Sequence, residues 1–498
     1  MTQPNFVFIM TDSQGANNIG AYGRPELQTP HLDRLAAEGI RFERAYTTCP
    51  ICTPARGGIF TGEYPHTCGA WANELPLTLT THTMGQRFRD NGYHTAFIGK
   101  WHLCGQDYFD TGICPDGWDD AYWFDGRRYM SELTDEEIRL WRQVLTTTEA
   151  LKEYDVPAEF TWGHRISERA IRFLQQPREQ PFVLVLSYDE PHGPCTCPKE
   201  YVERFEDYIW DPGPSKHDDM CNKPTLHRRF QDHFRNTWEF TEDGCLYYPP
   251  FFACNSFVDA EIGAVLAAVD RLAPPNTWVI FTSDHGQYMG AHGLNGKGLV
   301  MYEEAAHIPL IVRPPDRTLA GTVDRTLVSH VDILPTMLEI AGLEVPPVLE
   351  GESLVPNVTR GEQRSEKEVV IEWNRADVDN LDLISGLYPS RCLLSGNYKL
   401  VVNLLDTDEL YDLAADPHEM ANRIDDPALA AIRDTMHDHL VDWMNDTRDP
   451  FRGPGWLERP WHTSASYRHD PHGLKYPRPA DGYLPPTLDY MTGKPWQK

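Results

Sequence analysis

Short apolar runs recur along the chain, and polar residues follow most of them directly. Each run is rich in β-branched or aromatic residues, which is typical of buried β-strands. The runs are FVFIMT (6–11), HTAFIG (94–99), FVLVLSY (182–188), TWVIFTS (277–283) and PLIVRP (309–314). Because helical patterns separate the runs, we predict βαβ units and a mainly parallel sheet.

Two of the helical patterns are clear from their spacing. The segment 29–40 has Thr29 as N-cap, Pro30 at the first helical position and Gly39 just past the end. The segment 256–273 carries apolar residues on one helical face, namely Phe257, Ile262, Val265, Leu266 and Val269. We therefore expect an α/β fold in which helices sandwich a large, mainly parallel or mixed sheet.

The composition changes after residue 345, where turn-forming and charged residues become frequent. We predict a large α/β domain over residues 1–375 and a smaller α+β unit over residues 376–448, with a small antiparallel sheet and one helix. Residues 449–498 are rich in Pro and aromatic residues without periodicity, so we expect an irregular tail. The tail would lie over the fold or over a neighbouring subunit, which makes a homo-oligomer one expectation.

The charge balance narrows the possible functions. The 498-residue chain is 41% apolar and 24% charged, as in ordinary globular proteins. Its formal net charge of −29 argues against a nucleic-acid-binding protein, which needs an excess of Lys and Arg. An anionic ligand would have to bind in a local basic pocket.

The N-terminus, MTQPNFVFIM, has no basic segment and no small-residue cleavage site, so no signal peptide is visible. Apolar runs such as PFVLVL and WVIF are far shorter than the roughly 18 residues of a membrane span. We therefore expect a cytoplasmic protein without a membrane partner.

Eleven cysteines are scattered without a repeated spacing, which does not suit a disulfide framework. The pairs Cys49/Cys52 (CxxC) and Cys195/Cys197 (CxC) have the spacing of zinc half-sites, but neither has a convincing second half. Most of the cysteines are expected to be small buried side chains.

Chemically active residues follow four of the predicted strands. A single Asp or His after a strand is usually a turn or cap residue. However, the carboxyl ends of strands in an open α/β sheet form the ligand crevice, so four strands ending this way predict a site. The residues are Asp12, Lys100, His102, His192, Asp284 and His285.

These residue types suit a reaction at an anionic group. Such a site fits sulfuryl or phosphoryl transfer, where charge stabilisation dominates, but it lacks a nucleophile. In this interpretation Asp12, Asp284 and His285 hold a divalent cation, Lys100 and Lys297 neutralise an anion, and His102 and His192 exchange protons.

The stretch TTCPICTPARGG (47–58) admits two interpretations. In one, Cys49 and Cys52 form a redox or zinc-binding pair. In the other, Cys52 to Arg56 reads Cys-x-Pro-x-Arg, and Pro54 lies in the first turn of a short helix whose N-terminus favours an anion. The Cys-x5-Arg loop of protein tyrosine phosphatases does not fit, because Arg56 follows neither cysteine at that spacing.

Together with this stretch, motifs between residues 11 and 422 resemble the type I sulfatase family of the alkaline phosphatase superfamily. In family order they are TDSQG, TPHLDRLAAEGIRFERAY, CTPARGGIFTGEYPH, GYHTAFIGKWH, PHGP, TSDHG, the lysine of NGKG, YEEAAHIPLIVR and ELYDLAADPHEMAN. The resemblance implies an alkaline-phosphatase-like fold, a catalytic domain at residues 1–375 and hydrolysis of a sulfate ester.

The resemblance also implies that a formylglycine-generating enzyme oxidises Cys52 to Cα-formylglycine. The hydrated aldehyde has two hydroxyl groups on one carbon. One attacks sulfur, and deprotonation of the other expels sulfate. The implied roles are orientation of the formylglycine by Arg56 and proton uptake by His102, braced by Lys100. His192 and Lys297 would contact the sulfate and help to protonate the leaving alcohol. The implied metal ligands are Asp12, Asp284, His285 and residue 52.

Two positions depart from the family pattern. Ser13 stands where many relatives have a second acidic residue, and His285 stands where several have Asn. One carboxylate fewer and one imidazole more should weaken the preference for Ca²⁺ relative to Mn²⁺ or Zn²⁺. Calcium remains the expected metal, and either Ser13 or Gln14 completes its site.

Three alternatives remain at this point. The nearest is a phosphonate monoester or phosphodiester hydrolase with the same formylglycine machinery. The others are a redox or zinc-binding protein that uses Cys49 and Cys52, and a catalytically inactive binding protein.

The expected substrate is a small sulfated saccharide, such as a glycosaminoglycan-type oligosaccharide, by analogy with relatives. The acidic surface favours a small molecule over a polymer. The stretches 68–74 and 161–166 could line a sugar pocket, although Trp71 and Trp162 are equally suited to a core.

Overall fold

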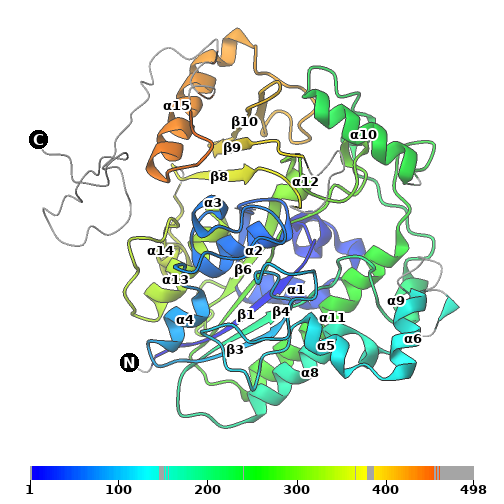
Figure 1. Ribbon diagram of the computed structural model, residues 1–498, viewed down its shortest axis with the longest axis vertical. Coiled ribbons are helices and arrows are strands. Elements are labelled where there is room, and N and C mark those ends of the chain that lie inside the picture. Colours follow the sequence, from blue (N-terminus) through cyan, green and yellow to red (C-terminus); the bar gives the residue numbers. More distant parts are fainter. Residues whose placement is uncertain are drawn as a thin grey trace, which may run out of the picture.

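The computed structural model describes residues 3–144, 151, 153–154, 156–238, 240–364, 366–377, 386–453, 456 and 459. A large sheet lies between two layers of helices, and a smaller sheet with one long helix lies beside it (Figure 1). Most of the predicted tail, 449–498, lies outside the described residues.

The large sheet has the order β3-β4-β1-β5-β6-β2-β7. β1 is parallel to β4 and β5, and β3 is parallel to β4, whereas β6 runs antiparallel to β5 and β2. The predicted α/β fold with a large mixed sheet is therefore confirmed. Its strands are β1 (Asn5–Thr11), β2 (Ile40–Tyr46), β3 (His94–Gly99), β4 (Phe182–Ser187), β5 (Thr277–Ser283), β6 (His307–Arg313) and β7 (Thr322–Ser329).

The sequence pattern did not predict β2 and β7, because neither contains a continuous apolar run. β2 contains Arg41, Glu43 and Arg44, all partly exposed, and β7 is the edge strand beside it. β2 mixes buried and partly exposed positions, and β7 is buried throughout only over its last four residues, so neither forms a continuous apolar run.

The two faces of the sheet bury alternate strand residues. Val7 and Ile9 of β1 pack in the cluster that contains α1, α8 and α11 side chains, and Phe6, Phe8 and Met10 pack in the cluster with α2, α4 and α13. The α-helices are α1 (Pro30–Glu38), α2 (Cys52–Thr61), α3 (Pro65–Cys68), α4 (Met84–Arg89), α5 (Gly126–Glu132), α6 (Asp135–Val144), α8 (Trp162–Gln175), α9 (Lys199–Arg204), α10 (Thr225–Thr237), α11 (Pro249–Leu272), α12 (Glu303–Ala306), α13 (Ile333–Ile340), α14 (Val355–Arg360) and α15 (Ala430–Asp446).

α1 confirms the predicted helix, with Pro30 at its start and Thr29 in the N-cap position. The Thr29 side chain does not cap the helix, because its Oγ1 accepts from Gly20 N at 2.8 Å. Gly39 follows the helix in an extended conformation, and the position requires glycine because a Cβ atom there would lie 2.6 Å from Val312 O.

The helix predicted at 256–273 begins earlier, at Pro249, because two prolines fit its first turn. α11 is also buried on most of its surface and not amphipathic, since it packs against α1, α8 and α9. By length and composition α11 could cross a membrane, but 78% of its apolar window is buried inside the protein. The core helix of a globular protein has the same properties.

The smaller sheet is antiparallel throughout, with the order β11-β10-β9-β8. α15 packs on it through Met436, Leu440 and Met444. β8 precedes residue 376, the predicted start of this unit. The strands are β8 (Glu368–Trp373), β9 (Ser390–Ser395), β10 (Tyr398–Asn403) and β11 (Glu409–Asp412).

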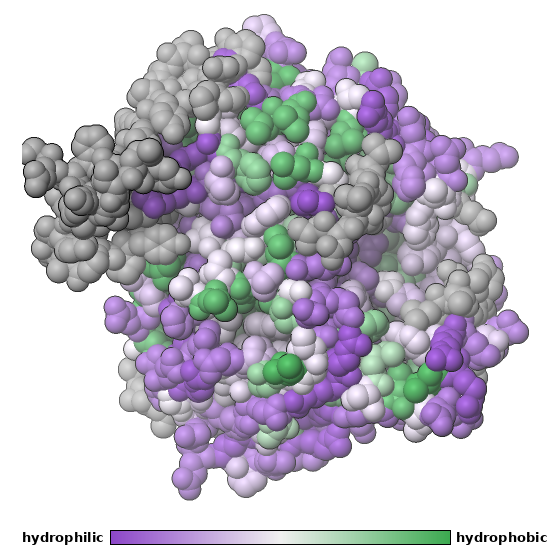
Figure 2. Space-filling view, viewed as in Figure 1, coloured by the Kyte–Doolittle hydropathy of each residue, from purple (hydrophilic) through white to green (hydrophobic). Residues whose placement is uncertain are grey.

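The face of the molecule in Figure 2 is mostly hydrophilic, and its hydrophobic side chains lie in small separate groups. This pattern agrees with the 24% charged residues of the sequence. No broad apolar surface is visible on this face.

Candidate active site

The carboxyl ends of four adjacent strands bring the predicted residues together. β3, β4, β1 and β5 are neighbours in that order, and three of the residues follow their last positions directly. Asp12, Lys100 and Asp284 are all fully buried. The strand order therefore concentrates charge at one rim of the sheet, as the open α/β arrangement predicts.

Asp12, Cys52, Asp284 and His285 form the strand-end cluster. Each offers one ligand atom, and these atoms all lie within 4.8 Å of one another. His285 Nδ1 lies 2.9 Å from Gly286 O, and a carbonyl only accepts, so the hydrogen is on Nδ1. Nε2, 3.3 Å from Cys52 Sγ, therefore has its lone pair available. Two carboxylates and an imidazole in this tautomer fit a divalent cation.

Arg56 holds the carboxylates of Asp12 and Asp284 in place. Its Nη2 lies 3.1 Å from Asp12 Oδ2, and its Nε lies 3.0 Å from Asp284 Oδ2. Nη1 donates to Ser187 Oγ at 2.9 Å and to Lys100 O at 2.7 Å. Because these bonds occupy a fully buried guanidinium, Arg56 orients the ligands as well as balancing their charge.

Cys52 is the first residue of α2 and faces the cluster. Lys297 Nζ donates to its Sγ at 2.9 Å. Burial and the Asp12 carboxylate raise the pKa of this thiol, but Lys297, Lys100 and His285 outweigh them and lower it to about 7. The thiol is thus surrounded by groups that stabilise negative charge.

Cys49 has a different environment. It lies in the apolar cluster with Tyr46, Ile51 and Trp373, and burial raises its pKa well above the usual value. All eleven cysteines are free thiols, including Cys49 and Cys52. The two thiols have no shared partner among the described contacts.

Lys100 is the second cation of the rim. Its Nζ lies 2.7 Å from Asp12 Oδ2 and 3.1 Å from Asp189 Oδ1, and 3.7 Å from the centre of the Tyr108 ring. Burial lowers the pKa of Lys100, but these two carboxylates outweigh burial and raise it above the usual value. Lys100 is therefore a fixed positive charge.

His102 is held in a left-handed backbone conformation with φ of 56°. Its N–H donates to Asp110 Oδ2 at 2.7 Å, and its carbonyl accepts from Thr53 Oγ1 at 2.9 Å. Its buried Nδ1 has no hydrogen-bond partner in the described part of the chain. Burial, together with the charge of Lys100, lowers the pKa of His102 to about 3, so the resting ring is neutral.

His192 lies near the same cations. Its Nδ1 is 2.7 Å from Gly193 O and 3.0 Å from Tyr108 Oη. Burial, followed by the charges of Lys297 and Lys100, lowers its pKa well below the usual value. The unprotonated ring is the resting form.

Ser13 and Gln14 have clearly different positions. Ser13 Oγ donates to Asp12 Oδ1 at 2.8 Å, beside the strand-end cluster. Gln14 Oε1 accepts from Thr11 Oγ1 at 2.9 Å, and its amide nitrogen donates to Asn255 Oδ1 at 2.6 Å. Of the two, Ser13 is the one whose side chain contacts a predicted metal ligand.

Sequence reasoning missed three residues of the site. Asp189 pairs with Lys100, Tyr108 contacts His192, and Asp110 fixes the backbone of His102. Asp189 follows β4 closely and could have been found by the rule used for Asp12. Tyr108 and Asp110 lie in a loop without periodicity, so no signal marked them.

The two stretches predicted to line a sugar pocket differ. Trp162 is 5% exposed and stacks on Tyr129 with ring centres 5.7 Å apart, which makes it a core residue. Trp71 is half-buried, and the nearby Asn73 accepts from Thr53 N at 3.0 Å. The loop of Trp71 therefore borders Cys52, whereas Trp162 does not offer a sugar platform.

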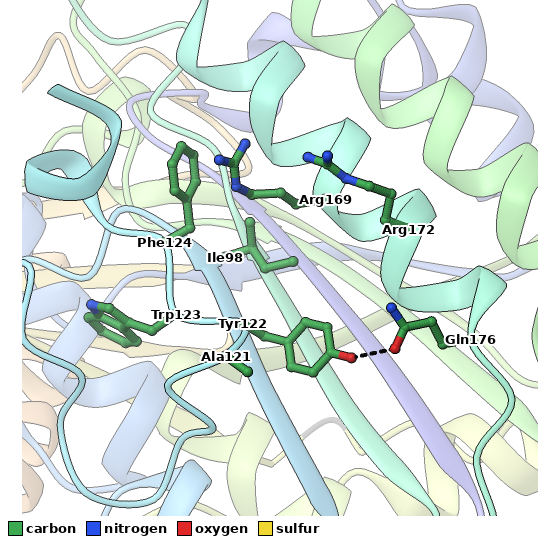
Figure 3. Close-up of a pocket in the computed structure, with 8 residues that line it drawn as sticks. All are labelled: Ile98, Ala121, Tyr122, Trp123, Phe124, Arg169, Arg172 and Gln176. Carbon is green, nitrogen blue, oxygen red and sulfur yellow. Dashed lines mark hydrogen bonds between the residues drawn. The ribbon is translucent and has the colours of Figure 1, made fainter. Parts of the chain in front are cut away.

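A separate cavity of about 260 Å³ lies beside β3 and α8 (Figure 3) and contains none of the predicted site residues. Arg169 stacks on Phe124 at 3.6 Å, and both Glu132 oxygens accept from it at 2.6 Å. Its charge is thus already neutralised. The lining residues are Ile98, Ala121, Tyr122, Trp123, Phe124, Arg169, Arg172 and Gln176.

The fold and the strand-end cluster define a hydrolase of the alkaline phosphatase superfamily. The Sulfatase family matches residues 4–343, and the family described as N-sulphoglucosamine sulphohydrolase, C-terminal, matches residues 290–446. The chain belongs to the sulfatase family. The predicted resemblance is confirmed, and the protein is a sulfatase, that is, a sulfuric ester hydrolase.

Similar proteins cover nearly the whole chain. An uncharacterized sulfatase, YidJ, of Escherichia coli (strain K12) is 48% identical over 499 residues, 100% of this chain and 98% of that protein. N-acetylglucosamine-6-O-sulfatase of Bacteroides thetaiotaomicron is 27% identical over 84% of this chain and 82% of that protein. A solved structure in complex with its substrate D-glucosamine-2-N,6-O-disulfate has a TM-score of 0.73 at 23% identity, over 90% of this chain and 99% of that chain, which shows the fold.

Proposed function

We propose that this sulfatase hydrolyses the sulfate ester of a small sulfated saccharide, with Cys52 converted to Cα-formylglycine beside a divalent cation. The carrying observation is that the ligand atoms of Asp12, Cys52, Asp284 and His285 lie within 4.8 Å of one another. Residue 52 is the first residue of α2, and a helix N-terminus stabilises an anion. The Asp12 and Asp284 carboxylates and the His285 imidazole would hold the cation.

The cation we propose is Ca²⁺. The carboxylates of Asp12 and Asp284 are hard oxygen ligands, which Ca²⁺ prefers. Because His285 adds an imidazole nitrogen, Mn²⁺ and Zn²⁺ are the competing ions. Ser13 would complete the metal site, because its Oγ lies 2.8 Å from Asp12 Oδ1.

The residues around the ester would each have a separate role in its hydrolysis. Hydrated formylglycine would supply the nucleophilic hydroxyl group. The unpartnered Nδ1 of His102 marks a ring that would take the proton of the second hydroxyl group, whose loss expels sulfate. Lys100 and Lys297 balance the sulfate charge, and His192 protonates the leaving alcohol.

The saccharide part of the proposal rests on two supports. The relative of Bacteroides thetaiotaomicron, 27% identical over most of both chains, is named for an N-acetylglucosamine 6-O-sulfate. In this protein the half-buried rings of Trp71 and Tyr108 lie in loops that contact the site, and aromatic faces pack well on sugar rings. The net charge of −29 disfavours long polyanions.

Two measurements test the proposal. The protein is produced together with a formylglycine-generating enzyme, and the peptide spanning Cys52 is examined by mass spectrometry. The metal-free protein is then assayed on defined sulfated mono- and disaccharides, with Ca²⁺, Mn²⁺ or Zn²⁺ added back singly. We expect an aldehyde at position 52 and turnover of a sulfated sugar that is highest with Ca²⁺.

The same assay includes a phosphonate monoester and a phosphodiester. A dominant rate on either of these would overturn the sulfated-saccharide substrate. An unmodified Cys52 in fully active protein would instead overturn the formylglycine step.

A further inference from the structure

Tyr108 lies between the two histidines of the site. Its ring centre is 5.6 Å from that of His102 and 5.2 Å from that of His192. The ring also covers the Lys100 ammonium at 3.7 Å. A single half-buried side chain therefore contacts both proposed proton carriers and the fixed cation between them.

The hydrogen bonds around His192 have a direction. Gly193 O can only accept, so His192 Nδ1 carries a hydrogen, and Tyr108 Oη lies 3.0 Å from the same nitrogen. The Tyr108 hydroxyl donates its own hydrogen to Asp189 Oδ1. The single Nδ1 hydrogen is thus shared between Gly193 O and Tyr108 Oη, and Tyr108 donates its own hydrogen to Asp189. This leaves His192 Nε2 as the nitrogen that can exchange a proton.

Asp189 is fixed from the other side. Its Oδ1 also accepts from Lys100 Nζ at 3.1 Å, and Lys100 is in turn held by Asp12 at 2.7 Å. One carboxylate oxygen therefore receives both the Tyr108 hydroxyl and the Lys100 ammonium. Tyr108, Asp189 and Lys100 therefore connect His192 to Asp12 at the end of β1.

We propose that Tyr108 and Asp189 are a positioning pair for His192. Gly193 O sets the tautomer. The pair orients the imidazole and, through the polarised Tyr108 hydroxyl, stabilises the imidazolium that the leaving-group step requires. Before that step the neutral ring takes a proton from solvent on Nε2. The attacking oxygen then bonds to sulfur as the S–O bond to the leaving group breaks, its electron pair goes to the leaving oxygen, and this oxygen takes the proton from His192 Nε2. The inference rests on the proposed function, because it assigns the pair to that site.

The packing of the Tyr108 ring does not depend on its hydroxyl. The Tyr108 ring is partly exposed and packs edge-on against Phe109, so a phenylalanine would keep the same packing. The hydroxyl connects the His192 ring to the Asp189 carboxylate, whereas the backbone of the two residues is joined separately by His192 N donating to Asp189 O at 3.0 Å. Tyr108→Phe therefore removes the connection with little change in volume.

The experiment compares two leaving groups in the wild type, Tyr108→Phe and Asp189→Asn. One substrate is 4-nitrophenyl sulfate, whose phenolate leaves without a proton, and the other is an alkyl or sugar sulfate, whose alkoxide needs one. General acid catalysis is worth about 10²-fold or more. We expect kcat/KM for the alkyl ester to fall about 10²-fold in either variant, with at most about a fivefold change for the aryl ester.

Tyr122→Phe is the matched control, because Tyr122 donates to Gln176 at 2.8 Å in the separate cavity beside β3. It should leave both rates unchanged. Equal losses on the two leaving groups, or no loss on either, would overturn the positioning role. A wild type that prefers phosphonate esters would overturn the proposed function. The aryl and alkyl leaving groups are then compared on phosphonates, and the ratio of kcat/KM between them still tests the positioning role.

Discussion

Two groups of buried charges lie in this molecule, one at the strand ends and one between the two sheets. The second, the junction cluster, contains Asp218, Lys223, Glu303, Lys399 and Glu419. Lys399 Nζ lies 3.1 Å from Glu303 Oε1 and 2.8 Å from Glu419 Oε1. Both groups combine carboxylates with cations in the interior, yet only the strand-end cluster has the features of a reaction site.

The difference lies in how each group satisfies its charges. Across the described residues, only the strand-end cluster has three or more ligand atoms of His, Cys, Asp or Glu within 4.8 Å of one another. The junction cluster pairs its lysines with carboxylates, and burial raises the pKa of Glu419 to about 7 even though Lys399 opposes this. Burial of charge alone therefore does not mark a reaction site, and the converging ligand atoms are what distinguish the strand-end cluster.

The largest expected effect is on activity at the strand ends. Cys52→Ala removes the precursor of the nucleophile, so kcat/KM should fall by about 10⁴-fold or more. The free energy of unfolding should change by less than about 1 kcal/mol, because the side chains differ by one sulfur atom. Kinetics and urea unfolding measure the two quantities, and retained activity in Cys52→Ala would contradict the proposed chemistry.

The second effect, in the junction cluster, is the opposite: a large loss of stability with little change in activity. Lys399→Met leaves Glu303 and Glu419 without their cation, and breaking a buried pair costs about 3–5 kcal/mol. Urea unfolding should show this loss, while kcat/KM of the folded protein stays within about twofold. Lys199→Met, at a lysine that is 43% exposed, is the control and should change neither quantity. A large loss of kcat/KM in folded Lys399→Met would remove the distinction between the clusters.

The third effect depends on pH and lies where α3 contacts β8. Burial lowers the pKa of His66, but Glu372 outweighs it and raises the pKa to about 9. This contribution to stability, on the order of 3 kcal/mol, is complete below the unfolded value of about 6.5 and is lost as the pH rises through about 9. The free energy of unfolding should decrease across that interval.

His66→Gln should flatten this decrease, and the same substitution at the exposed His82 should not. Thermal unfolding between pH 6 and pH 10 provides the measurement. An unchanged pH dependence in His66→Gln would show that the His66–Glu372 pair does not hold the two units together.

The smallest effect separates the two cysteines of the CxxC stretch. Cys49→Ala removes a sulfur from the apolar cluster and should destabilise the protein by about 1 kcal/mol. Activity should be retained, since Cys49 contacts no residue of the strand-end cluster in the described contacts. A loss of activity as great as that of Cys52→Ala would restore the interpretation as a functional pair.

Much of the site was predictable because it is built from local rules. A buried apolar run followed by Asp12, Lys100 or Asp284 indicates a strand and a polar strand end together. Pro54 and Arg56 likewise mark a short helix after Cys52. Such residues are visible in the sequence because strand burial and helix starts depend on neighbouring positions.

Other residues were not predictable because their roles depend on distant partners. Tyr108 has no periodic neighbours, and its importance comes from contacts with Asp189 and His192, more than 80 positions away. The same holds for Trp162. Its sequence context suited a sugar pocket, but its ring stacks on Tyr129 in the core. Pattern alone cannot distinguish an aromatic platform from a core ring.

The sequence by itself determined the main strands, the α/β class and the residue types of a sulfatase site, because hydrophobic burial and short motifs act over a few positions. Only the tertiary structure decided which charges meet. It brought Cys52 to 3.3 Å from His285, 233 positions away, and paired Lys399 with Glu303 elsewhere. Those contacts follow from strand order and the packing of the two sheets, which are set by long-range burial that no local pattern contains.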